Sequence, residues 1–265
     1  NQYLANWGLL STTRMAVYQS LDFIKGSLDF LRWPIREKYR EIIENTDAFI
    51  AVSKAVKELN LVHLPELSSK PFEIIYNPVI VSDVHVSEEM INDVIVYASG
   101  NNILKGYHIL LHAMREVVKY FPRVKLLMIG KFDNYLMFTA KRYGISKNLV
   151  ICRYLKHQDL LKLFAKSRLV VLPSIIPDAF GRVVVEANMV GTPVVASNIG
   201  GIPEMIQEGV TGFLAKPNNP SDLAEKIVKA LSKSWNKASI KELTRKKFDQ
   251  HRIVKKLLTF FSRMK

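Results

Sequence analysis

The sequence predicts an α/β fold in which a doubly wound, Rossmann-like parallel sheet is covered by helices on both faces. From residue 94 onward, short apolar segments alternate regularly with longer amphipathic segments. The short segments are almost entirely apolar and do not alternate regularly with polar residues, which is typical of strands buried on both faces. Strands and helices that alternate in this way form parallel sheets, which bind ligands at the carboxyl ends of their strands.

The individual elements follow from the same patterns. In the first expected helix the apolar residues from Leu110 to Phe121 fall on one face. Gly144 ends the second helix and Gly191 ends the last one, because glycine favours the conformation that terminates helices. The expected strands are 94–98, 124–129, 149–152, 169–172 and 193–196, and the expected helices are 107–120, 134–143, 158–167 and 182–190.

The first 80 residues predict a smaller unit. We expect helical structure over about 9–45, strands at 48–52 and 72–76, a helix at 54–59 and a turn at Asn77-Pro78. Two strands are too few for an independent doubly wound sheet. Since the chain also begins with Asn, we expect it to be the later part of a longer protein whose leading strands are absent.

Composition sets limits on the class of protein. A chain of 265 residues with 48% apolar and 23% charged residues is ordered and globular. It contains no apolar run long enough to span a membrane and no pattern of a secretory signal, so we expect a soluble cytoplasmic protein. Cys152 is the single cysteine, which excludes an internal disulfide and a thiolate metal cluster within this chain. The six histidines are scattered, and none is assigned a catalytic role.

The net charge of +14 is concentrated at the carboxyl end, where residues 231–265 hold 11 basic and 2 acidic side chains. Residues 237–265 predict an amphipathic helix with a cationic face. One interpretation is a helix that packs on the protein with its charges in solvent. Another is contact with an anionic membrane, which would make the protein peripheral on the inner face of the membrane. Nucleic acid is disfavoured, because no nucleic-acid-binding motif accompanies the charge.

The segment 177–195 places two carboxylates eight positions apart across a Phe-Gly turn. Asp178 falls in the loop after the strand 169–172, and Glu186 about two turns into the next helix. A carboxylate there lies roughly 6 to 9 Å from the helix start, about the span from a nucleotide's phosphates to its ribose. Polar and glycine residues also follow other strands, and this edge is therefore the predicted binding site. These residues are Gly100 to Lys105, Gly130, Lys131, Gly200 and Gly201.

Several of these segments resemble the family-4 retaining glycosyltransferases of the GT-B fold. The resemblance covers almost the whole chain and is carried by the segments 47–53, 74–79, 178–195, 200–204, 209–214 and 248–264. It implies a partial N-terminal acceptor-side domain at 1–80, a nucleotide-sugar-binding domain at 81–247 and a C-terminal crossing helix at 248–265.

The resemblance also implies roles for individual residues. Glu186 would accept hydrogen bonds from the ribose, and Asp178 would contact hydroxyls of the transferred sugar. Lys105 would bind the diphosphate and neutralise the leaving group, so that no metal cofactor is needed. Asp178 and Lys105 are thus the expected catalytic residues. The full expected donor-binding set is Gly100, Lys105, Gly130, Arg153, Asp178, Phe180, Gly181, Arg182 and Glu186, with Phe180, Gly181 and Arg182 acting through backbone N–H groups.

Three features depart from the family pattern. The leading acid of the carboxylate pair is usually Glu and here is Asp178, one methylene shorter. The arginine that normally precedes the phosphate lysine is replaced by Gly100 or Asn101, and Arg153 is a candidate to compensate. The leading half of the acceptor domain, with the histidine that the family places near the reacting sugar, is missing.

These observations favour an enzyme that transfers a sugar from a UDP- or GDP-sugar to a glycan or lipid acceptor, with retention at the anomeric carbon. This would place it in polysaccharide or glycolipid biosynthesis. The alternative is a donor-binding fragment or subunit that is inactive alone and needs a separate acceptor domain. A third possibility is a basic interaction module that uses residues 237–265 and keeps the fold as a scaffold.

Overall fold

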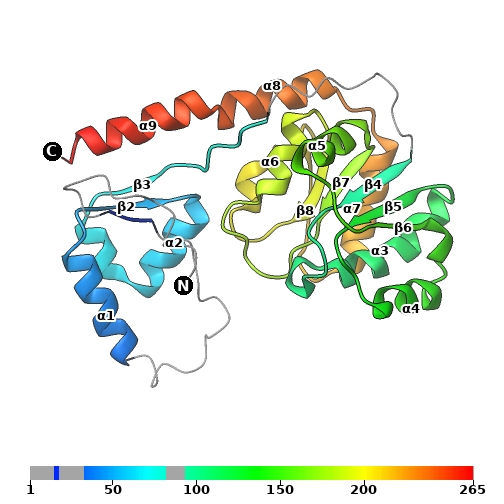
Figure 1. The fold of residues 1–265 in the computed structure, drawn as a ribbon, viewed down its shortest axis with the longest axis horizontal. Helices are drawn as coiled ribbons and strands as arrows, with labels where there is room; N and C mark the ends of the chain where they lie inside the picture. The colour runs from blue at the N-terminus through cyan, green and yellow to red at the C-terminus, as the bar shows by residue number, and fades with distance from the viewer. Residues whose placement is uncertain (1–14, 18–32, 82–92, 265) are drawn as a thin grey trace. The chain divides into compact units, whose positions relative to one another are not determined.

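The computed structural model describes residues 15–17, 33–81 and 93–264, and the chain separates into two compact units (Figure 1). One unit is formed by residues 1–76 and 253–265, and the other by residues 77–252. Of the helical segment predicted at 9–45, residues 9–14 and 18–32 lie outside the described residues. The two units are described separately.

The larger unit contains a six-stranded parallel sheet with the order β6-β5-β4-β7-β8-β9. The chain adds strands outward from β4 in one direction and then returns to β7 and adds strands in the other direction. This is the doubly wound arrangement that the sequence predicts, and its switch point lies between β4 and β7. The strands are β4 (Val94–Tyr97), β5 (Lys125–Ile129), β6 (Leu149–Cys152), β7 (Leu169–Leu172), β8 (Val194–Ser197) and β9 (Gly212–Ala215).

Helices cover both faces of this sheet (Figure 1). Helices α3, α4 and α7 form one layer, and α5, α6 and α8 form the other. Short 3₁₀ helices lie in the loops. The α-helices are α3 (Tyr107–Tyr120), α4 (Asn134–Arg142), α5 (His157–Lys166), α6 (Arg182–Met189), α7 (Pro220–Ser232) and α8 (Lys237–Phe248), and the 3₁₀ helices are η3 (Ile103–Lys105), η4 (Ser146–Asn148) and η5 (Ile202–Met205).

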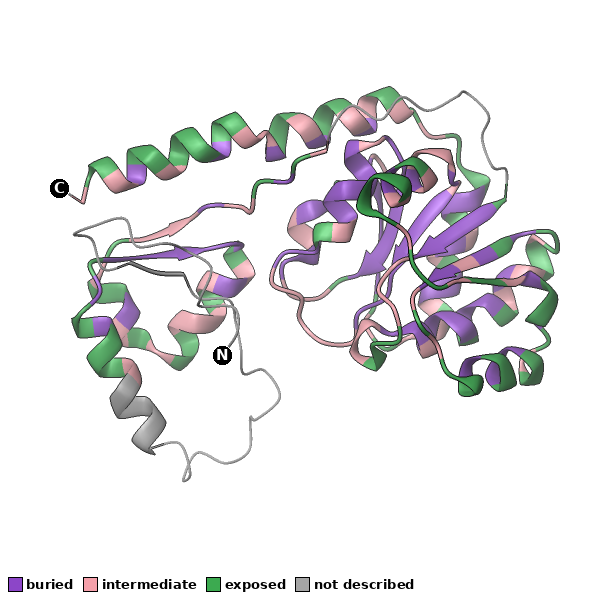
Figure 2. Cartoon of the chain, viewed as in Figure 1, coloured by how far each residue is buried: buried purple, intermediate pink, exposed green. Residues whose placement is uncertain are grey.

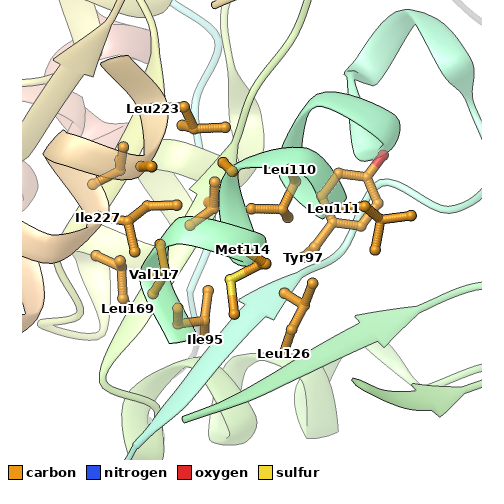
Figure 3. Packing of buried hydrophobic residues seen from close by; sticks show 14 of the residues in the cluster. Ile95, Tyr97, Leu110, Leu111, Met114, Val117, Leu126, Leu169, Leu223 and Ile227 are labelled. Atoms are coloured by element: carbon orange, nitrogen blue, oxygen red, sulfur yellow. The ribbon is translucent and has the colours of Figure 1, made fainter. Parts of the chain in front are cut away.

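The core explains why the strand segments are almost entirely apolar. Every residue of β4, β7 and β8 is buried (Figure 2). Ile95 and Leu169 from the sheet pack with Met114 of α3 and Ile227 of α7 (Figure 3). Strand β6 lies at the sheet edge and is partly exposed. Burial on both faces is what makes the central strands easy to predict from sequence.

Helix α6 starts at Arg182, as the sequence predicts, but its functional carboxylate lies closer to the helix start than expected. Helix α6 runs from Arg182 to Met189 and ends before Gly191, whose φ is +89°. Glu186 is therefore about one turn into the helix, and the prediction of two turns was wrong. At about 1.5 Å per residue, four residues place it roughly 6 Å along the axis, at the short end of the expected span.

The smaller unit contains a three-stranded parallel sheet with the order β1-β2-β3. The sequence predicted two strands here, and the helical prediction was wrong at Met15–Val17, which forms β1 beside β2. A three-residue strand is stabilised by its neighbour and has no local pattern of its own. The elements are β1 (Met15–Val17), α1 (Trp33–Glu44), β2 (Ala48–Ala51), α2 (Lys54–His63), η2 (Pro65–Ser69), β3 (Phe72–Ile74) and most of α9 (Gln250–Ser262).

The carboxyl-terminal segment forms two helices where the sequence predicted a single one over 237–265. Helix α8 ends at Phe248 and α9 begins at Gln250. Asp249 between them has a non-helical backbone (ψ 125°), and its Oδ1 accepts a hydrogen bond from the Arg252 backbone N–H at 2.9 Å. Aspartate at a helix start competes with continuation of the preceding helix, which explains the break.

The apolar side of α9 packs on the smaller sheet. Ile253 and Phe260 join Ala48, Ile50 and Ile75 in one buried cluster. The Lys256 ammonium donates to the Ile74 carbonyl at 2.6 Å. This part of the predicted amphipathic helix therefore uses its apolar face within the protein.

Candidate active site at the sheet switch point

The loop after β4 presents Lys105 at the carboxyl edge of the sheet. Asn102 caps the 3₁₀ helix η3, since its Oδ1 accepts the Leu104 N–H at 3.0 Å, and Lys105 is the last residue of η3. Gly106 follows with φ +73°, and a side chain there would overlap the Pro173 carbonyl. The Ile175 N–H also donates to the Leu104 carbonyl at 3.0 Å. The loops after β4 and β7 are thus packed against each other.

Lys105 and Asp178 meet across these two loops. The Lys105 ammonium lies 2.5 Å from Oδ2 of Asp178, and the two side chains are 28% and 21% exposed. The ion pair is therefore partly desolvated but still open to a ligand. Because β4 and β7 flank the switch point of the sheet, the pair lies where doubly wound folds bind their ligands.

The backbone of Asp178 is held by the glycine pair after β8. The Gly201 N–H donates to the Asp178 carbonyl at 2.7 Å, and Gly200 pairs with Asp178 in an isolated bridge. Gly200 has φ +60°, and a Cβ on it would lie 2.5 Å from the Asp178 carbonyl oxygen. A glycine is needed there for two reasons, conformation and space. The predicted sites after β7 and β8 are therefore brought together.

Helix α6 begins at this loop. Gly181 precedes it with φ +74°, and Phe180 is buried in edge contact with Phe248 of α8, with 5.7 Å between ring centroids. The first N–H groups of an α-helix have no acceptor within the helix and carry partial positive charge. The start of α6 is thus suited to bind an anion close to Lys105 and Asp178.

Glu186 is the buried carboxylate of the site, with 4% of its surface exposed. Its Oε1 lies 2.9 Å from Nε of Arg182, one turn earlier on α6. The same oxygen lies 3.0 Å from Nε2 of His157, the first residue of α5. Such partners offset the cost of burying a polar carboxylate.

His157 is a site residue that the sequence analysis missed. Residues 157 and 186 are far apart along the chain, and no spacing rule connects them. Its place shortly after the end of β6 was the available signal, because every strand of a parallel sheet ends at the same edge.

The loops after β5 and β4 also touch. Gly130 has φ +141°, and a Cβ there would lie 2.5 Å from the Cα of Gly100. The Gly100 N–H donates to the Ile129 carbonyl at 3.2 Å. Gly100 and Gly130 therefore lie side by side at the carboxyl edge. Arg153 is exposed after β6, and among the described residues no side-chain hydrogen bond or ion pair joins it to this cluster.

The first two residues of α3, Tyr107 and His108, carry aromatic rings that are partly or fully buried. Burial lowers the pKa of His108 below its usual value and, with Asp133 and Tyr135, raises the pKa of Tyr107. His108 is therefore neutral at pH 7, and the positive charge at the start of α3 comes from Lys105. This arrangement suits neutralisation of a phosphate by one lysine and a helix terminus.

Neither a metal cluster nor a membrane-crossing helix is found in the parts of the chain that the structure describes. No group of three or more His, Cys, Asp or Glu side chains there could hold a metal ion. No helix there has both the length and the apolar character needed to cross a membrane.

Residues 82–247, more than half of the chain, match the family model of the glycosyl transferases group 1. The chain belongs to this family. The matched range contains each site residue described above, from Gly100 to Gly201.

Individual relatives agree with this assignment. The chain is 33% identical over 145 residues to D-inositol 3-phosphate glycosyltransferase of Segniliparus rotundus, covering 52% of this chain and 32% of the relative. It is 27% identical to spore coat protein SA of Bacillus subtilis, covering 64% and 48%. The chain thus spans half or less of the length of these curated relatives.

Among solved structures, the chain resembles Anabaena HepE in complex with UDP and glucose. The TM-score is 0.72 at 24% sequence identity, and the alignment covers 86% of this chain and 66% of HepE. This likeness confirms the fold, a GT-B glycosyltransferase architecture with a Rossmann-like parallel sheet.

Proposed function

We propose that this glycosyltransferase takes a sugar from a nucleoside-diphosphate sugar, with the donor bound at the switch point between β4 and β7. The observation that carries the proposal is the ion pair of Lys105 and Asp178 beside the start of α6. It combines a cation and a helix terminus for the diphosphate with a carboxylate for the sugar. Glu186 supplies the ribose contact about one turn along α6.

In the proposed reaction, the donor's diphosphate replaces Asp178 as the ion-pair partner of Lys105. The carboxylate of Asp178 is then free to accept hydrogen bonds from hydroxyls of the sugar. As the bond between the anomeric carbon and the phosphate oxygen breaks, negative charge grows on the diphosphate. Lys105 and the N–H groups at the start of α6 stabilise that charge without reorganising. We infer a metal-independent transfer with retention, in which these fixed groups, and not a metal ion, neutralise the charge on the diphosphate.

The proposed donor is a UDP- or GDP-sugar, and the proposed acceptor is a glycan or a lipid. UDP has the better support, because HepE was solved with UDP and with UDP-glucose and has the same fold.

Calorimetric titration tests the donor site. We expect one member of a panel of UDP-, GDP- and ADP-sugars to bind, and Glu186→Ala to weaken it by about tenfold or more, since a charge-assisted bond is lost. Glu225→Ala, on the exposed side of α7, is the matched control and should bind like the unaltered chain. If no sugar nucleotide binds, the donor-site proposal fails.

Proton NMR of the released sugar tests the stereochemistry. With an α-linked donor, a retaining reaction gives the α anomer first, and the β anomer appears only by later mutarotation. Immediate release of the β anomer would contradict retention. Binding without hydrolysis or transfer would favour the alternative function, a donor-binding subunit that needs a separate acceptor domain.

Helix α9 supports a second proposal, contact with an anionic membrane through the segment 237–265. Val254 and Leu258 are 42% and 61% exposed at i and i+4, and Lys255 lies exposed beside them. Basic amphipathic helices of this type bind anionic bilayers. We expect Val254→Ser with Leu258→Ser to reduce cosedimentation with phosphatidylserine vesicles and to leave donor binding unchanged. Equal cosedimentation of both chains would exclude this use of α9.

A further inference from the structure

The carboxylate of Glu186 is held at one oxygen by two donors from two different helices. Arg182 reaches Oε1 along α6 at 2.9 Å, and His157 reaches the same oxygen from α5 at 3.0 Å. A carboxylate oxygen offers about two acceptor positions, so these two donors occupy Oε1.

The second oxygen is left for a ligand. In the part of the chain that the structure describes, neither of these contacts involves Oε2. Oε2 is also absent from the set of fully buried polar atoms without a hydrogen-bond partner, so it is not sealed from solvent. Oε2 therefore keeps contact with solvent, although the Glu186 side chain as a whole is only 6% exposed.

Arg182 and His157 have different geometric effects. Arg182 is on the same helix as Glu186 and supplies the charge partner that a buried carboxylate requires. His157 approaches from a neighbouring helix, and its side chain is 49% exposed. A second donor from another direction fixes the rotation of the carboxylate about its last side-chain bond. The carboxylate can accept from Nε2 only when that nitrogen carries a hydrogen, which assigns the hydrogen to Nε2.

We propose that His157 is a positioning residue, which turns Glu186 so that Oε2 accepts hydrogen bonds from the ribose hydroxyls of the donor. The inference rests on the proposed function, in which Glu186 contacts the ribose. His157 thereby sets the preference for ribonucleotides over their deoxy analogues. Sites built to hydrogen-bond a hydroxyl reject analogues that lack it, provided that the acceptor is held in place.

Titration of matched nucleotide pairs tests this role. Calorimetry on the whole chain compares UDP with 2′,3′-dideoxy-UDP, and GDP with 2′,3′-dideoxy-GDP. For whichever pair binds, we expect the unaltered chain to prefer the nucleotide with ribose hydroxyls by about tenfold or more. The dideoxy analogue loses its hydrogen bonds to a charged acceptor. His157→Leu should remove most of that preference by weakening the hydroxylated nucleotide, while affinity for the dideoxy analogue stays the same.

Two further variants separate positioning from packing. In His157→Gln the amide nitrogen can take the place of Nε2, and we expect it to restore a large part of the preference. His157→Asn is polar but too short, and should behave like His157→Leu. His251→Leu, at an exposed position of α9, is the control for loss of a surface histidine. Thermal melts of each variant report folding separately from the ratio of affinities.

The possible outcomes distinguish this inference from the proposal beneath it. An unaltered chain that binds hydroxylated and dideoxy nucleotides equally well, or binds none of them, contradicts the ribose contact of Glu186 and the inference with it. An unaltered chain that discriminates, with His157→Leu and His157→Asn retaining the full ratio, overturns the role of His157 alone. A loss of affinity that is equal for both nucleotides also overturns it.

Discussion

The ammonium of Lys105 lies 2.5 Å from the carboxylate of Asp178, although 73 positions separate the two residues in the chain. Each residue follows one of the two strands at the switch point of the sheet. In the proposed mechanism they bind two adjacent parts of the donor. Lys105 binds the diphosphate, and Asp178 binds the sugar. Without a donor they neutralise each other, so the donor has to displace an internal ion pair.

Replacement of Asp178 by Asn is therefore expected to affect the affinities for nucleoside diphosphate and sugar nucleotide differently. The ion pair is partly exposed, and pairs of this kind contribute up to about 1 kcal/mol, or about fivefold in affinity. Freed from that competition, Lys105 in Asp178→Asn should bind UDP up to about fivefold more tightly. UDP-sugar should gain less or lose affinity. Calorimetry with UDP and with UDP-sugar measures both affinities. Weaker UDP binding by Asp178→Asn would contradict the competition between Asp178 and the diphosphate for Lys105.

Replacement of Lys105 by Ala is expected to weaken both ligands. A hydrogen bond to a charged group contributes about 1.5 to 3 kcal/mol, which corresponds to a loss of about 10- to 150-fold. Lys141→Ala, at an exposed position on α4, removes the same charge away from the site and serves as control. Equal losses in the two variants would show a general effect of net charge, and Lys105 would lose its assigned role.

The residues of this pair could be predicted from sequence, but their contact could not. Each follows an apolar strand, and central strands buried on both faces are easy to recognise, so the pattern placed Lys105 and Asp178 at the binding edge. The family resemblance implied their roles. The contact depends on which strands become neighbours, a property of the sheet order. The same holds for His157 and Glu186, which come from α5 and α6.

Two errors in the secondary structure have local physical causes. The break at Asp249 interrupts an amphipathic pattern that continues on both sides, and periodicity alone does not detect it. The readable signal was a capping residue, since Asp249 accepts from Arg252 three positions later. Strand β1 is three residues long and exists through its pairing with β2, so nothing in its own sequence distinguishes it from a helix.

Close packing of the loops after β4 and β7 predicts a difference between two glycines of almost identical conformation. Gly106 and Gly144 have φ of +73° and +72°. A Cβ at Gly106 would overlap the Pro173 carbonyl, whereas at Gly144 nothing lies within 4 Å. Gly144→Ala should therefore lower the free energy of unfolding by about 1 kcal/mol through conformation alone. Gly106→Ala should lower it by at least about 1 kcal/mol more and should weaken donor binding. Urea denaturation measures both, and equal losses would contradict the steric argument.

The contact of Phe180 with Phe248 predicts that α8 supports the donor loop. Phe248 is 1% exposed and lies edge-on to Phe180 at the start of α6. Phe248→Ala should lower the free energy of unfolding by about 3 to 5 kcal/mol, the usual range for a buried phenylalanine. Leu243→Ala, also on α8 but 37% exposed, is expected to have a much smaller effect. Phe248→Leu retains most of the volume, so a loss of donor affinity in that folded variant would identify the ring contact as the support of the loop.

Because Lys237 is partly buried, we expect its contribution to the free energy of unfolding to rise with pH in the alkaline range. Its ammonium donates to the Ala165 carbonyl at 2.7 Å, while burial, and secondarily Arg168, lower its pKa below the ordinary value of 10.5. The unfolded chain therefore binds more protons at this position than the folded chain does, between the lowered pKa and 10.5. Stability rises with pH wherever the unfolded state binds more protons.

Comparison with Lys237→Met isolates this contribution. The difference in unfolding free energy between the unaltered chain and Lys237→Met should shift in favour of the unaltered chain as the pH rises from 7 towards 10. Lys247, whose pKa burial also lowers, is present in both chains and cancels in the difference. Urea denaturation at several pH values measures the slope. A difference that stays constant would mean that Lys237 has the same pKa folded and unfolded, and a difference of opposite slope would mean that the hydrogen bond to Ala165 outweighs burial.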